Sequence, residues 1–209
     1  MYIPPHFAEI DPARIAEIIE AAPLACIVAQ TAQGLVANHI PLLAAPDGAL
    51  IGHVALANDM HHVLAEGQAV LAVFRGPDGY VSPNSYPTKA EHHRHVPTWN
   101  YQAVHVHGTI AFSHDEHAKR AAVGLLTRLH ERRVNGAQAW RMGDAPVDYM
   151  QRMLDGIVAF RISVSHVLAK SKLSQNREPV DLQGAIDGAR RSGHEALADR
   201  MAAQRAGDD

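Results

Sequence analysis

The chain has 209 residues, of which 47% are hydrophobic and 20% are charged, and its formal net charge is −3. This composition is sufficient for a sizeable folded core and excludes an intrinsically disordered chain. The slight acidic excess argues against a strong electrostatic attraction to DNA.

From the length we expect a main domain over residues 1–180 and a C-terminal helical segment over 181–209. The single cysteine, Cys26, excludes an internal disulfide, and its apolar surroundings predict a small buried side chain. The N-terminus lacks the pattern of a secretion signal, and no apolar stretch is long enough to span a membrane. A soluble, cytoplasmic protein without a membrane partner is therefore expected.

The first half of the chain reads as one helix followed by strands. Asp11 caps a helix in which Pro12 takes the first position, and Pro23 ends it. Apolar runs between turn residues then predict strands at 24–30 and 35–43, which form a hairpin, and further strands at 49–55, 69–75 and 80–82. A brief helix is expected at 62–67, and a turn at 76–79.

The second half mixes strands with longer helices. A strand is predicted at 101–112, and Ser113 with Glu116 forms a capping box for a helix that continues to about Arg133. A helix at 145–154, a strand at 156–167 and helices at 182–192 and 194–205 complete the chain. Few strands alternate with helices, so we predict an α+β fold with a mainly β core, an antiparallel barrel with inserted and C-terminal helices.

The common catalytic and phosphate-binding signatures are missing from the sequence. The chain has no G-x-G-x-x-G or G-x-x-x-x-G-K-[ST] loop, no H-E-x-x-H, no cysteine pair and no G-x-S-x-G. No residue therefore stands out as a catalytic acid or nucleophile, and no standard zinc site is predicted.

The segment from Tyr80 to Gly108 is unusually rich in aromatic and polar side chains. It contains one of the two tryptophans, three of the five tyrosines and five of the fifteen histidines. A planar ligand with polar edges requires such a set, so we interpret the segment as part of a binding site. The alternative is an ordered surface loop whose aromatic side chains fill a groove.

Five polar clusters lie at the ends of predicted strands. In the cluster at residues 52–58, Gly52 would allow close approach of a ligand. His53 and Asn58 would supply donors near a helix start, where anions bind readily. A single cluster is more commonly a turn, but five together indicate a site. They are residues 38–41, 52–58, 82–85, 97–101 and 170–177.

These clusters carry a resemblance to the PaiB family, whose members are described as FMN-binding negative transcriptional regulators with a flavin-reductase-like split β-barrel. The similarity runs from about Tyr2 to Gly188 and includes the motifs Tyr2-Ile3-Pro4-Pro5-His6-Phe7, Pro97-Thr98-Trp99-Asn100-Tyr101 and Lys172-Leu173-Ser174-Gln175-Asn176-Arg177. The resemblance implies FMN as cofactor and a site formed by Asn38, His39, Ile40, Pro41, His53, Ala55, Asn58, Ser82, Pro83, Thr98, Trp99, Asn100, Tyr101, His105, Lys172, Gln175 and Arg177.

An isoalloxazine ring suits these residues in outline. Trp99 or Tyr101 would cover one face of the ring, while main-chain groups near His39 and Asn100 would meet its edge. The phosphate would contact His53, Asn58 and either Lys172 or Arg177. Split-barrel relatives hold flavin at a dimer interface, so the resemblance also implies a homodimer, and any redox chemistry would belong to the cofactor.

The chain departs from the family pattern at two places. Leu56 and Asp59 replace an arginine and a proline, and Ser85 replaces a tryptophan. If that arginine neutralises the FMN phosphate, its loss removes a contact worth about 1.5–3 kcal/mol, or roughly tenfold to a hundredfold in affinity.

The positions of the histidines are compatible with a metal or haem site. His105 and His107 lie two apart on one predicted strand and so share a face, and either a metal site or a hydrogen bond of His105 inside the barrel is compatible with that position. For the run from His92 to His95 we favour a solvated loop.

The arginines of the helices permit two interpretations. They alternate with acidic residues, which favours a solvated, salt-bridged surface over direct DNA contact. These arginines are Arg120, Arg128, Arg132, Arg133, Arg190, Arg191, Arg200 and Arg205.

Three functions follow from the sequence. The first is an FMN-dependent sensor or regulator, and the second is a flavin- or haem-dependent oxidoreductase of the same fold. The third is a cofactor-free regulator that binds DNA or a protein partner.

Overall fold

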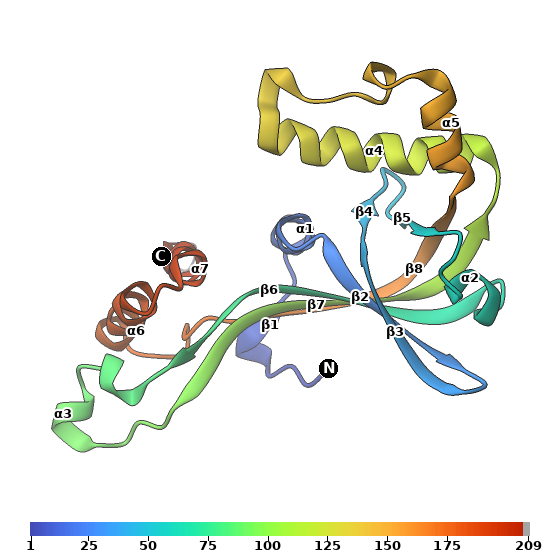
Figure 1. Ribbon diagram of the computed structural model, residues 1–209. Coiled ribbons are helices and arrows are strands. Elements are labelled where there is room, and N and C mark those ends of the chain that lie inside the picture. The colour runs from blue at the N-terminus through green and yellow to red at the C-terminus, as the bar shows by residue number, and fades with distance from the viewer. Residues whose placement is uncertain (207–209) are drawn as a thin grey trace. The chain divides into compact units, whose positions relative to one another are not determined.

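The computed structural model describes residues 1–206, with side chains up to Gln204, so residues 207–209 of the predicted C-terminal segment lie outside it. The strands are β1 (Ala8–Glu9), β2 (Leu24–Thr31), β3 (Gly34–Pro41), β4 (Leu43–Ala44), β5 (Leu50–Ala55), β6 (Gln68–Val81), β7 (Thr98–Ser113) and β8 (Ile157–Lys172). The α-helices are α1 (Pro12–Ala21), α2 (Met60–Val63), α3 (Lys89–His92), α4 (Glu116–Asn135), α5 (Val147–Asp155), α6 (Pro179–Arg191) and α7 (Glu195–Ala206) (Figure 1). Short 3-10 helices are η1 (Pro5–Phe7), η2 (Pro83–Ser85), η3 (Gly136–Gln138) and η4 (Met142–Asp144).

The strands form one sheet in the order β3-β2-β6-β7-β8-β5-β4, and β1 pairs with β8 outside this path. The pairs β1–β8, β2–β3, β2–β6, β4–β5 and β5–β8 are all antiparallel. This arrangement confirms the predicted α+β fold with a mainly β core. Among the helices of the described residues, none is long and apolar enough to cross a membrane.

The chain divides into two compact units. Unit 1 comprises Met1–Ala22, Arg75–Val104 and the residues from Leu168 onward, and unit 2 comprises Pro23–Phe74 and His105–Val167. The strands β6, β7 and β8 each contribute one end to each unit. Unit 1 includes α6 and α7, while the expected boundary at residue 180 stays a prediction.

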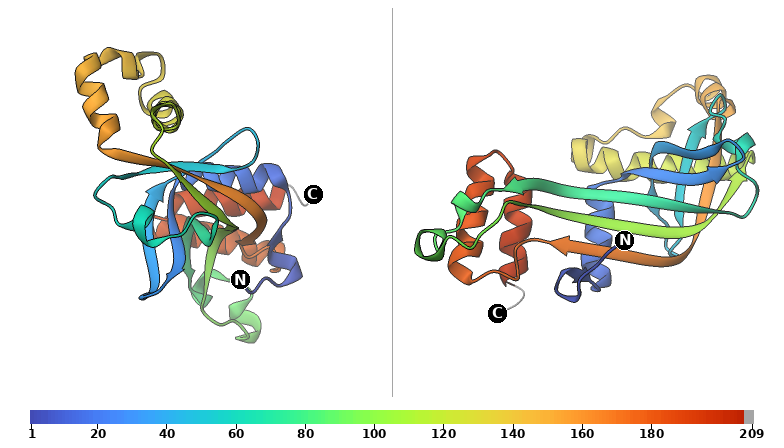
Figure 2. Two further views of the ribbon diagram at one scale, coloured as in Figure 1. Left: turned by 90° about the vertical axis from the view of Figure 1, so that its right-hand side faces the viewer. Right: turned by 90° about the horizontal axis from the view of Figure 1, so that it is seen from below.

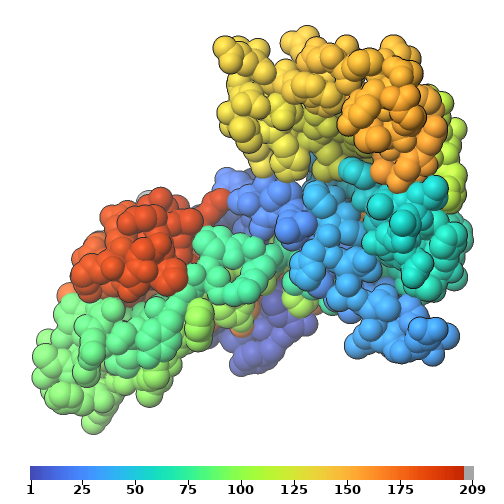
Figure 3. Space-filling model, in the orientation of Figure 1, coloured from blue at the N-terminus to red at the C-terminus, as the bar shows by residue number. Residues whose placement is uncertain are grey.

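Unit 1 is built around α6 and α7. Its core joins apolar residues of these helices, such as Leu182 and Met201, to Val81, Tyr86 and Leu173, all of them buried. Two glycines of α6, Gly184 and Gly188, face Ser85 so closely that a Cβ at either position would overlap its atoms. The glycines therefore allow η2 to pack directly on the helix backbone, and α6 and α7 lie beside residues 83–95 (Figure 3).

Unit 2 contains the hairpin, the remaining barrel strands and the helices α4 and α5. The predicted hairpin is confirmed, with Cys26 opposite His39 and Leu24 opposite Pro41, and β3 lies at the edge of the sheet path. Cys26 is only half-buried, so the prediction of a buried side chain is wrong. The residues from α4 to α5 form a helical layer over β5 (Figure 2).

The expected turn at residues 76–79 is absent, because β6 continues through it to Val81. Gly76 lies so close to the side chain of Gln102 that a Cβ would come within 3.1 Å of the Gln102 Cβ. The described register of β6 with β2 ends at Val73, so the missing N–H of Pro77 costs no bond in that register. Tertiary pairing therefore overrides a sequence that would form a turn in isolation.

The long helix begins two residues later than a cap at Ser113 would place it. Asp115 is the N-cap, and its carboxylate accepts a hydrogen bond from the N–H of Ala118 at 2.9 Å. Ser113 instead accepts from the N–H of Asp115 at 3.2 Å. A carboxylate at the N-cap also interacts favourably with the helix dipole, which explains why Asp115 takes this role.

Candidate functional site

The predicted site residues fall into two groups, one in each unit. The group in unit 1 consists of Ser82, Pro83, Thr98, Trp99, Asn100, Tyr101, Lys172, Gln175 and Arg177. The group in unit 2 consists of Asn38, His39, Ile40, Pro41, His53, Ala55, Asn58 and His105.

A small pocket of unit 1 brings together four of the predicted residues. Its volume is about 130 Å³, and it lies where β7 begins and where β8 ends. The predicted residues Thr98, Asn100, Lys172 and Arg177 line it together with Phe7, Tyr86, Ser174 and Asn176.

Hydrogen bonds between the two strand ends hold this pocket together. The Nζ of Lys172 donates to the carbonyl oxygen of Trp99 at 2.7 Å and to the hydroxyl of Thr98. The Nδ2 of Asn100 donates to the Oγ of Ser174 at 2.8 Å, and Asn100 and Ser174 are both buried. The pocket is therefore positioned before any ligand binds.

Gln175 fixes the turn that follows β8. Its Nε2 donates to the carbonyl oxygens of His6 at 3.0 Å and Ser171 at 2.6 Å, while its Oε1 accepts from the N–H of Leu173 at 2.8 Å. Within this turn Ser174 takes a left-handed conformation with φ of 66°. The amide of Gln175 is thus used in positioning the loop, although the resemblance implies a contact with the cofactor.

Positive charge dominates the pocket. Burial lowers the pKa of Lys172 below its ordinary value, and the nearby cations Lys170 and Arg177 lower it further. The guanidinium of Arg177 lies 5.1 Å from the centre of the Tyr86 ring. No carboxylate lines this pocket of described residues. An anion bound here would relieve the repulsion between the cations and raise the pKa of Lys172 toward its ordinary value.

Two buried polar atoms of the pocket residues have no hydrogen-bond partner among the described residues. They are the hydroxyl of Tyr86 and the Oδ1 of Asn100. An unsatisfied buried polar group costs about 1–3 kcal/mol, so such atoms commonly mark a place for a ligand or water. The hydroxyl can donate to a phosphate oxygen, and the Asn100 oxygen can accept from a hydroxyl of the ligand. The donor set therefore fits the phosphate and ribityl chain of FMN.

Exposed aromatic rings lie next to the pocket. Trp99 is 55% exposed and Tyr80 is 50% exposed, and their ring centres are 6.2 Å apart in an edge-to-face arrangement. The Trp99 backbone is held by Lys172, so the indole is anchored at the pocket. Tyr101 is half-buried, with the Nζ of Lys170 5.1 Å from its ring centre. Trp99 is thus the better placed of the two for covering a flavin face.

Ser82 and Pro83 take structural roles in unit 1. The hydroxyl of Ser82 accepts from the N–H of Asn84 at 3.2 Å, and Pro83 begins η2. Neither residue lines the pocket.

In unit 2, Asn38 and Asn58 come together. The Nδ2 of Asn58 donates to the Oδ1 of Asn38 at 3.1 Å, and the Oδ1 of Asn58 accepts from the N–H of Met60 at 2.9 Å. The next residues along β3 alternate between exposed His39, buried Ile40 and exposed Pro41. The two amides therefore connect β3 to the start of α2, a helix of four residues.

The second predicted cluster behaves differently from expectation at Gly52. The ring of Phe160 and the side chain of Leu42 occupy the space beside it, so the prediction that Gly52 leaves room for a ligand is wrong. His53 is half-buried, burial lowers its pKa, and its Nδ1 is buried without a partner among the described residues. Ala55 is exposed, and its carbonyl accepts from the N–H of Asn58 at 2.9 Å.

At Leu56 an apolar side chain stands exposed at the end of β5. Its backbone N–H donates to the carbonyl oxygen of Gly156 at 2.8 Å, so the backbone is fixed while the side chain is free to vary. An arginine would fit this position on the surface of unit 2.

The histidines of the described residues do not gather into a metal-binding group. No group of three or more His, Cys, Asp or Glu side chains among the described residues could hold a metal ion. His105 is half-buried, and burial, together with the neighbouring His107, lowers its pKa. The ring of His107 stacks on His166 with centres 4.2 Å apart.

His95 contradicts the prediction of a solvated loop. Its side chain is only 6% exposed, and its Nε2 lies 2.8 Å from the Thr88 hydroxyl and 3.3 Å from an oxygen of Asp181. Thr88 donates to Asp181 from both its N–H and its hydroxyl, at 3.1 and 2.7 Å. A loop after η2 is thereby attached to α6.

The arginines follow the predicted salt-bridged pattern only in part. Arg120, Arg190 and Arg200 pair with Glu116, Asp199 and Glu17. Arg128 and Arg132 have no carboxylate within 4.0 Å among the residues that the structure describes, so for them the prediction of a salt-bridged surface is wrong. The side chain of Arg205 lies outside the described part.

Comparisons with known proteins agree with this geometry. A family model described as "Putative FMN-binding domain" matches residues 1–166. The chain is 28% identical over 190 residues to "Protease synthase and sporulation protein PAI 2" of Bacillus subtilis (strain 168), which covers 90% of this chain and 88% of that protein.

Solved structures show the same fold. An FAD and heme binding protein from Mycobacterium smegmatis is similar with a TM-score of 0.59 at 18% identity, over 78% of this chain and 72% of that one. The flavocytochrome Anf3 from Azotobacter vinelandii gives a TM-score of 0.59 at 16% identity, over 81% and 72% of the two chains. The solved structures confirm the split-barrel fold. The family match and the Bacillus relative confirm the expected resemblance, and the family match confirms FMN as the cofactor.

Four pocket residues were not selected from the sequence. Ser174 and Asn176 lie inside the Lys172–Arg177 motif, and Phe7 ends the N-terminal motif. Tyr86 follows the departure at Ser85. Their position within or beside these motifs is the one sequence feature that could have identified them. Nothing in the sequence shows which residues of a motif line a common pocket.

Proposed function

We propose, from the premise that this chain belongs to the family described as "Putative FMN-binding domain", that the pocket of unit 1 holds the FMN phosphate and that the protein acts as a flavin-dependent sensor or regulator. Lys172 and Arg177 bind the phosphate, and Trp99 covers one face of the isoalloxazine. The single observation that carries this proposal is the pair of uncompensated cations in a small, hydrogen-bonded pocket.

The volume of the pocket supports a phosphate seat. At about 130 Å³ it is well below the roughly 300–1,000 Å³ of pockets that enclose a whole drug-sized ligand. The isoalloxazine would then lie outside it, against exposed aromatic surface such as Trp99 and Tyr80. FMN supplies the redox chemistry when bound, and the residues of this chain bind and orient it.

A homodimer and a cytoplasmic location belong to the same proposal. Exposed apolar side chains of unit 1, among them Tyr80, Val96 and Trp99, would be covered by a second copy of the chain. Light scattering on the protein with and without FMN measures the oligomeric state, and a monomer under both conditions contradicts the dimer.

Titration of FMN fluorescence tests the phosphate seat directly. Replacing Lys172 or Arg177 by Gln removes a charge-assisted contact, so each variant is expected to bind FMN roughly tenfold to a hundredfold more weakly. Arg190→Gln is the matched control, since Arg190 is exposed, lies in the same unit and pairs with Asp199. The proposal fails if wild-type protein does not quench FMN, or if the control loses as much affinity as the pocket variants.

Leu56→Arg distinguishes the proposed seat from the cluster at residues 53–58. With the phosphate in the pocket of unit 1, the added arginine leaves FMN affinity unchanged. A tenfold or larger gain in affinity would assign the phosphate to unit 2 instead. Catalytic oxidation of NADH or NADPH by FMN-loaded protein would assign an oxidoreductase in place of a sensor.

A further inference from the structure

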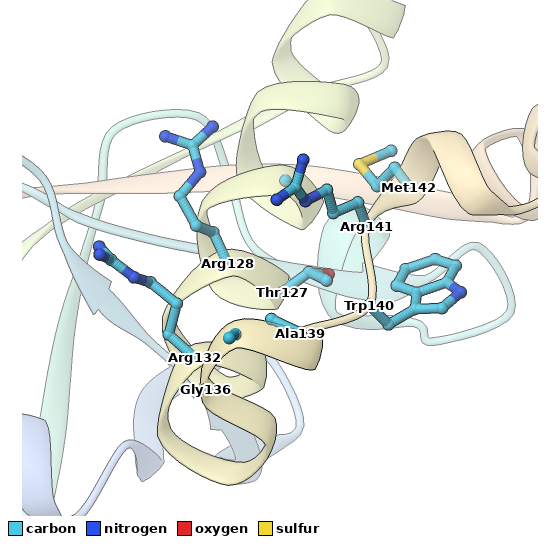
Figure 4. Close-up of a pocket in the computed structure, with 10 residues that line it drawn as sticks. Thr127, Arg128, Arg132, Gly136, Ala139, Trp140, Arg141 and Met142 are labelled. Carbon is cyan, nitrogen blue, oxygen red and sulfur yellow. The ribbon is translucent and has the colours of Figure 1, made fainter.

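A second and larger pocket lies in unit 2, and none of its lining residues belongs to the predicted FMN site. Its volume is about 640 Å³, and it opens between α4 and the segment that contains η3 and η4. Gly124, Thr127, Arg128, Arg132, Gly136, Ala137, Ala139, Trp140, Arg141 and Met142 line it (Figure 4).

Three arginines give this pocket its charge. Arg128 and Arg132 are four residues apart on α4 and share one face, while Arg141 comes from the opposite segment (Figure 4). None of the three guanidinium groups forms a salt bridge among the described residues, and no acidic side chain lines the pocket. Like charges at this helical spacing repel each other, so an arrangement of this kind is stabilised by a bound anion.

The wall opposite α4 is held in place by hydrogen bonds outside the pocket. Glu131 accepts from the N–H of Trp140 at 3.0 Å and from the Nδ2 of Asn135 at 2.7 Å, and the bond to Asn135 and the bond to Trp140 lower its pKa. Asp144 accepts from the N–H of Arg141 at 2.8 Å. The backbone positions of Trp140 and Arg141 are therefore fixed relative to α4.

The remaining lining offers a flat apolar surface. Trp140 is 41% exposed, which leaves part of its indole available to a planar group. The Sδ of Met142 lies 3.5 Å from where a Cβ of Gly124 would be, so the thioether covers the glycine of α4. Small residues at 136, 137 and 139 keep the space open.

We propose that this pocket is a second ligand site, specific for a small molecule that joins at least two anionic groups to a flat aromatic part, the chemistry of nucleotides. Guanidinium groups bind phosphates bidentately, and Trp140 stacks on the aromatic part. The volume falls within the range of sites for small molecules, and a concave site of this size suits a free nucleotide better than a nucleic-acid backbone.

Isothermal titration with ADP tests the proposal on the full chain saturated with FMN. Wild-type protein is expected to bind one ADP, to bind pyrophosphate roughly tenfold more weakly, and to bind adenosine at least a hundredfold more weakly. Arg128→Gln and Arg132→Gln each weaken ADP binding roughly tenfold or more, and the double variant more strongly. Pyrophosphate binding as tightly as ADP would overturn the aromatic part of the proposal.

Matched variants distinguish a loss of ADP binding at this pocket from a folding defect and from a loss of FMN binding. Arg120→Gln removes one charge from the same helix outside the pocket, where Arg120 pairs with Glu116 at 2.8 Å, and it is expected to leave ADP affinity unchanged. Lys172→Gln loses FMN affinity but keeps ADP binding, so the two sites fail independently. Arg132 also lies in the last turn of α4, where a cation interacts with the helix dipole, and that role alone would lower melting temperature without moving ADP affinity.

Several results would overturn the proposal. One is the absence of a heat signal with both ADP and pyrophosphate. Another is an ADP affinity that is the same for Arg128→Gln, Arg132→Gln and wild type. A third is the release of one bound FMN for each ADP that binds. A gel shift with single-stranded RNA or DNA that is lost in the Arg128→Gln, Arg132→Gln double variant, with no ADP binding, would assign the arginines to a nucleic acid instead.

Discussion

The two units carry cationic pockets of opposite character. In unit 1, where β7 begins and β8 ends, the side chains are hydrogen-bonded and partly buried, and the pocket measures about 130 Å³. Along α4, in unit 2, the arginines are exposed and uncompensated, and the pocket measures about 640 Å³. A ligand in the first pocket meets groups that are already ordered, whereas a ligand in the second must order long side chains as it binds. Substitutions in unit 1 should therefore lower the free energy of unfolding, whereas substitutions of the arginines on α4 should lower the affinity for a ligand.

The largest effect is expected at Asp181, which is 2% exposed on α6. Asp181→Ala removes the carboxylate that accepts from the N–H and hydroxyl of Thr88 and lies beside the buried His95, and we expect a loss of about 3 kcal/mol in the free energy of unfolding. Urea denaturation followed by circular dichroism measures it. Asp187→Ala is the control, because its carboxylate bonds to Gln183 on the exposed side of the same helix. Equal losses for both variants would refute the buried network.

The sequence predicted most elements, and the errors have identifiable physical causes. The caps at Asp11 and Pro12 and the alternating runs of β2 and β3 are local signals, and the structure confirms them. Residues 76–79 form no turn, because the pairing of Gly76 with its neighbour strand is decided by contacts distant in sequence. His95 was expected in solvent for the same reason, since its partner Asp181 lies far along the chain.

The two pockets differ in how far sequence could predict them. The residues at 98–100 and 172–177 stand in short motifs, so their chemistry could be recognised and their meeting at two strand ends expected. The wide pocket combines Gly124, Arg128 and Arg132 of one helix with Trp140 and Arg141 of a loop. Each of these reads alone as an ordinary surface residue, and only the path of η3 and η4 brings them to a common space.

A pair of glycine substitutions tests the difference in packing. Gly184→Ala on α6 places a Cβ against the carbonyl oxygen of Ser85, and we expect a loss of about 1–3 kcal/mol in the free energy of unfolding. Gly124→Ala on α4 meets only the Sδ of Met142 at contact distance, and the gain in helix propensity should stabilise the protein by about 0.5–1 kcal/mol.

Thermal denaturation of the two glycine variants and of wild type shows whether each substitution stabilises or destabilises the protein. The comparison between the helices holds if the melting temperature falls for Gly184→Ala and rises for Gly124→Ala. A fall of similar size in both would mean that α4 is packed as tightly as α6.

The smallest effect is expected in the pH dependence of stability, through His53 of unit 2. Burial lowers the pKa of this imidazole below its ordinary value of 6.5, so the folded protein binds its proton less readily than the unfolded chain does. The stability that the neutral side chain provides is therefore complete above pH 6.5 and is lost as the pH falls below that value toward the lowered pKa. His53→Gln keeps a polar side chain without a proton equilibrium in this range. Unfolding midpoints at pH 7.5 and pH 5.5 should differ less in this variant than in wild type, and an unchanged difference would show that other groups set the acid sensitivity.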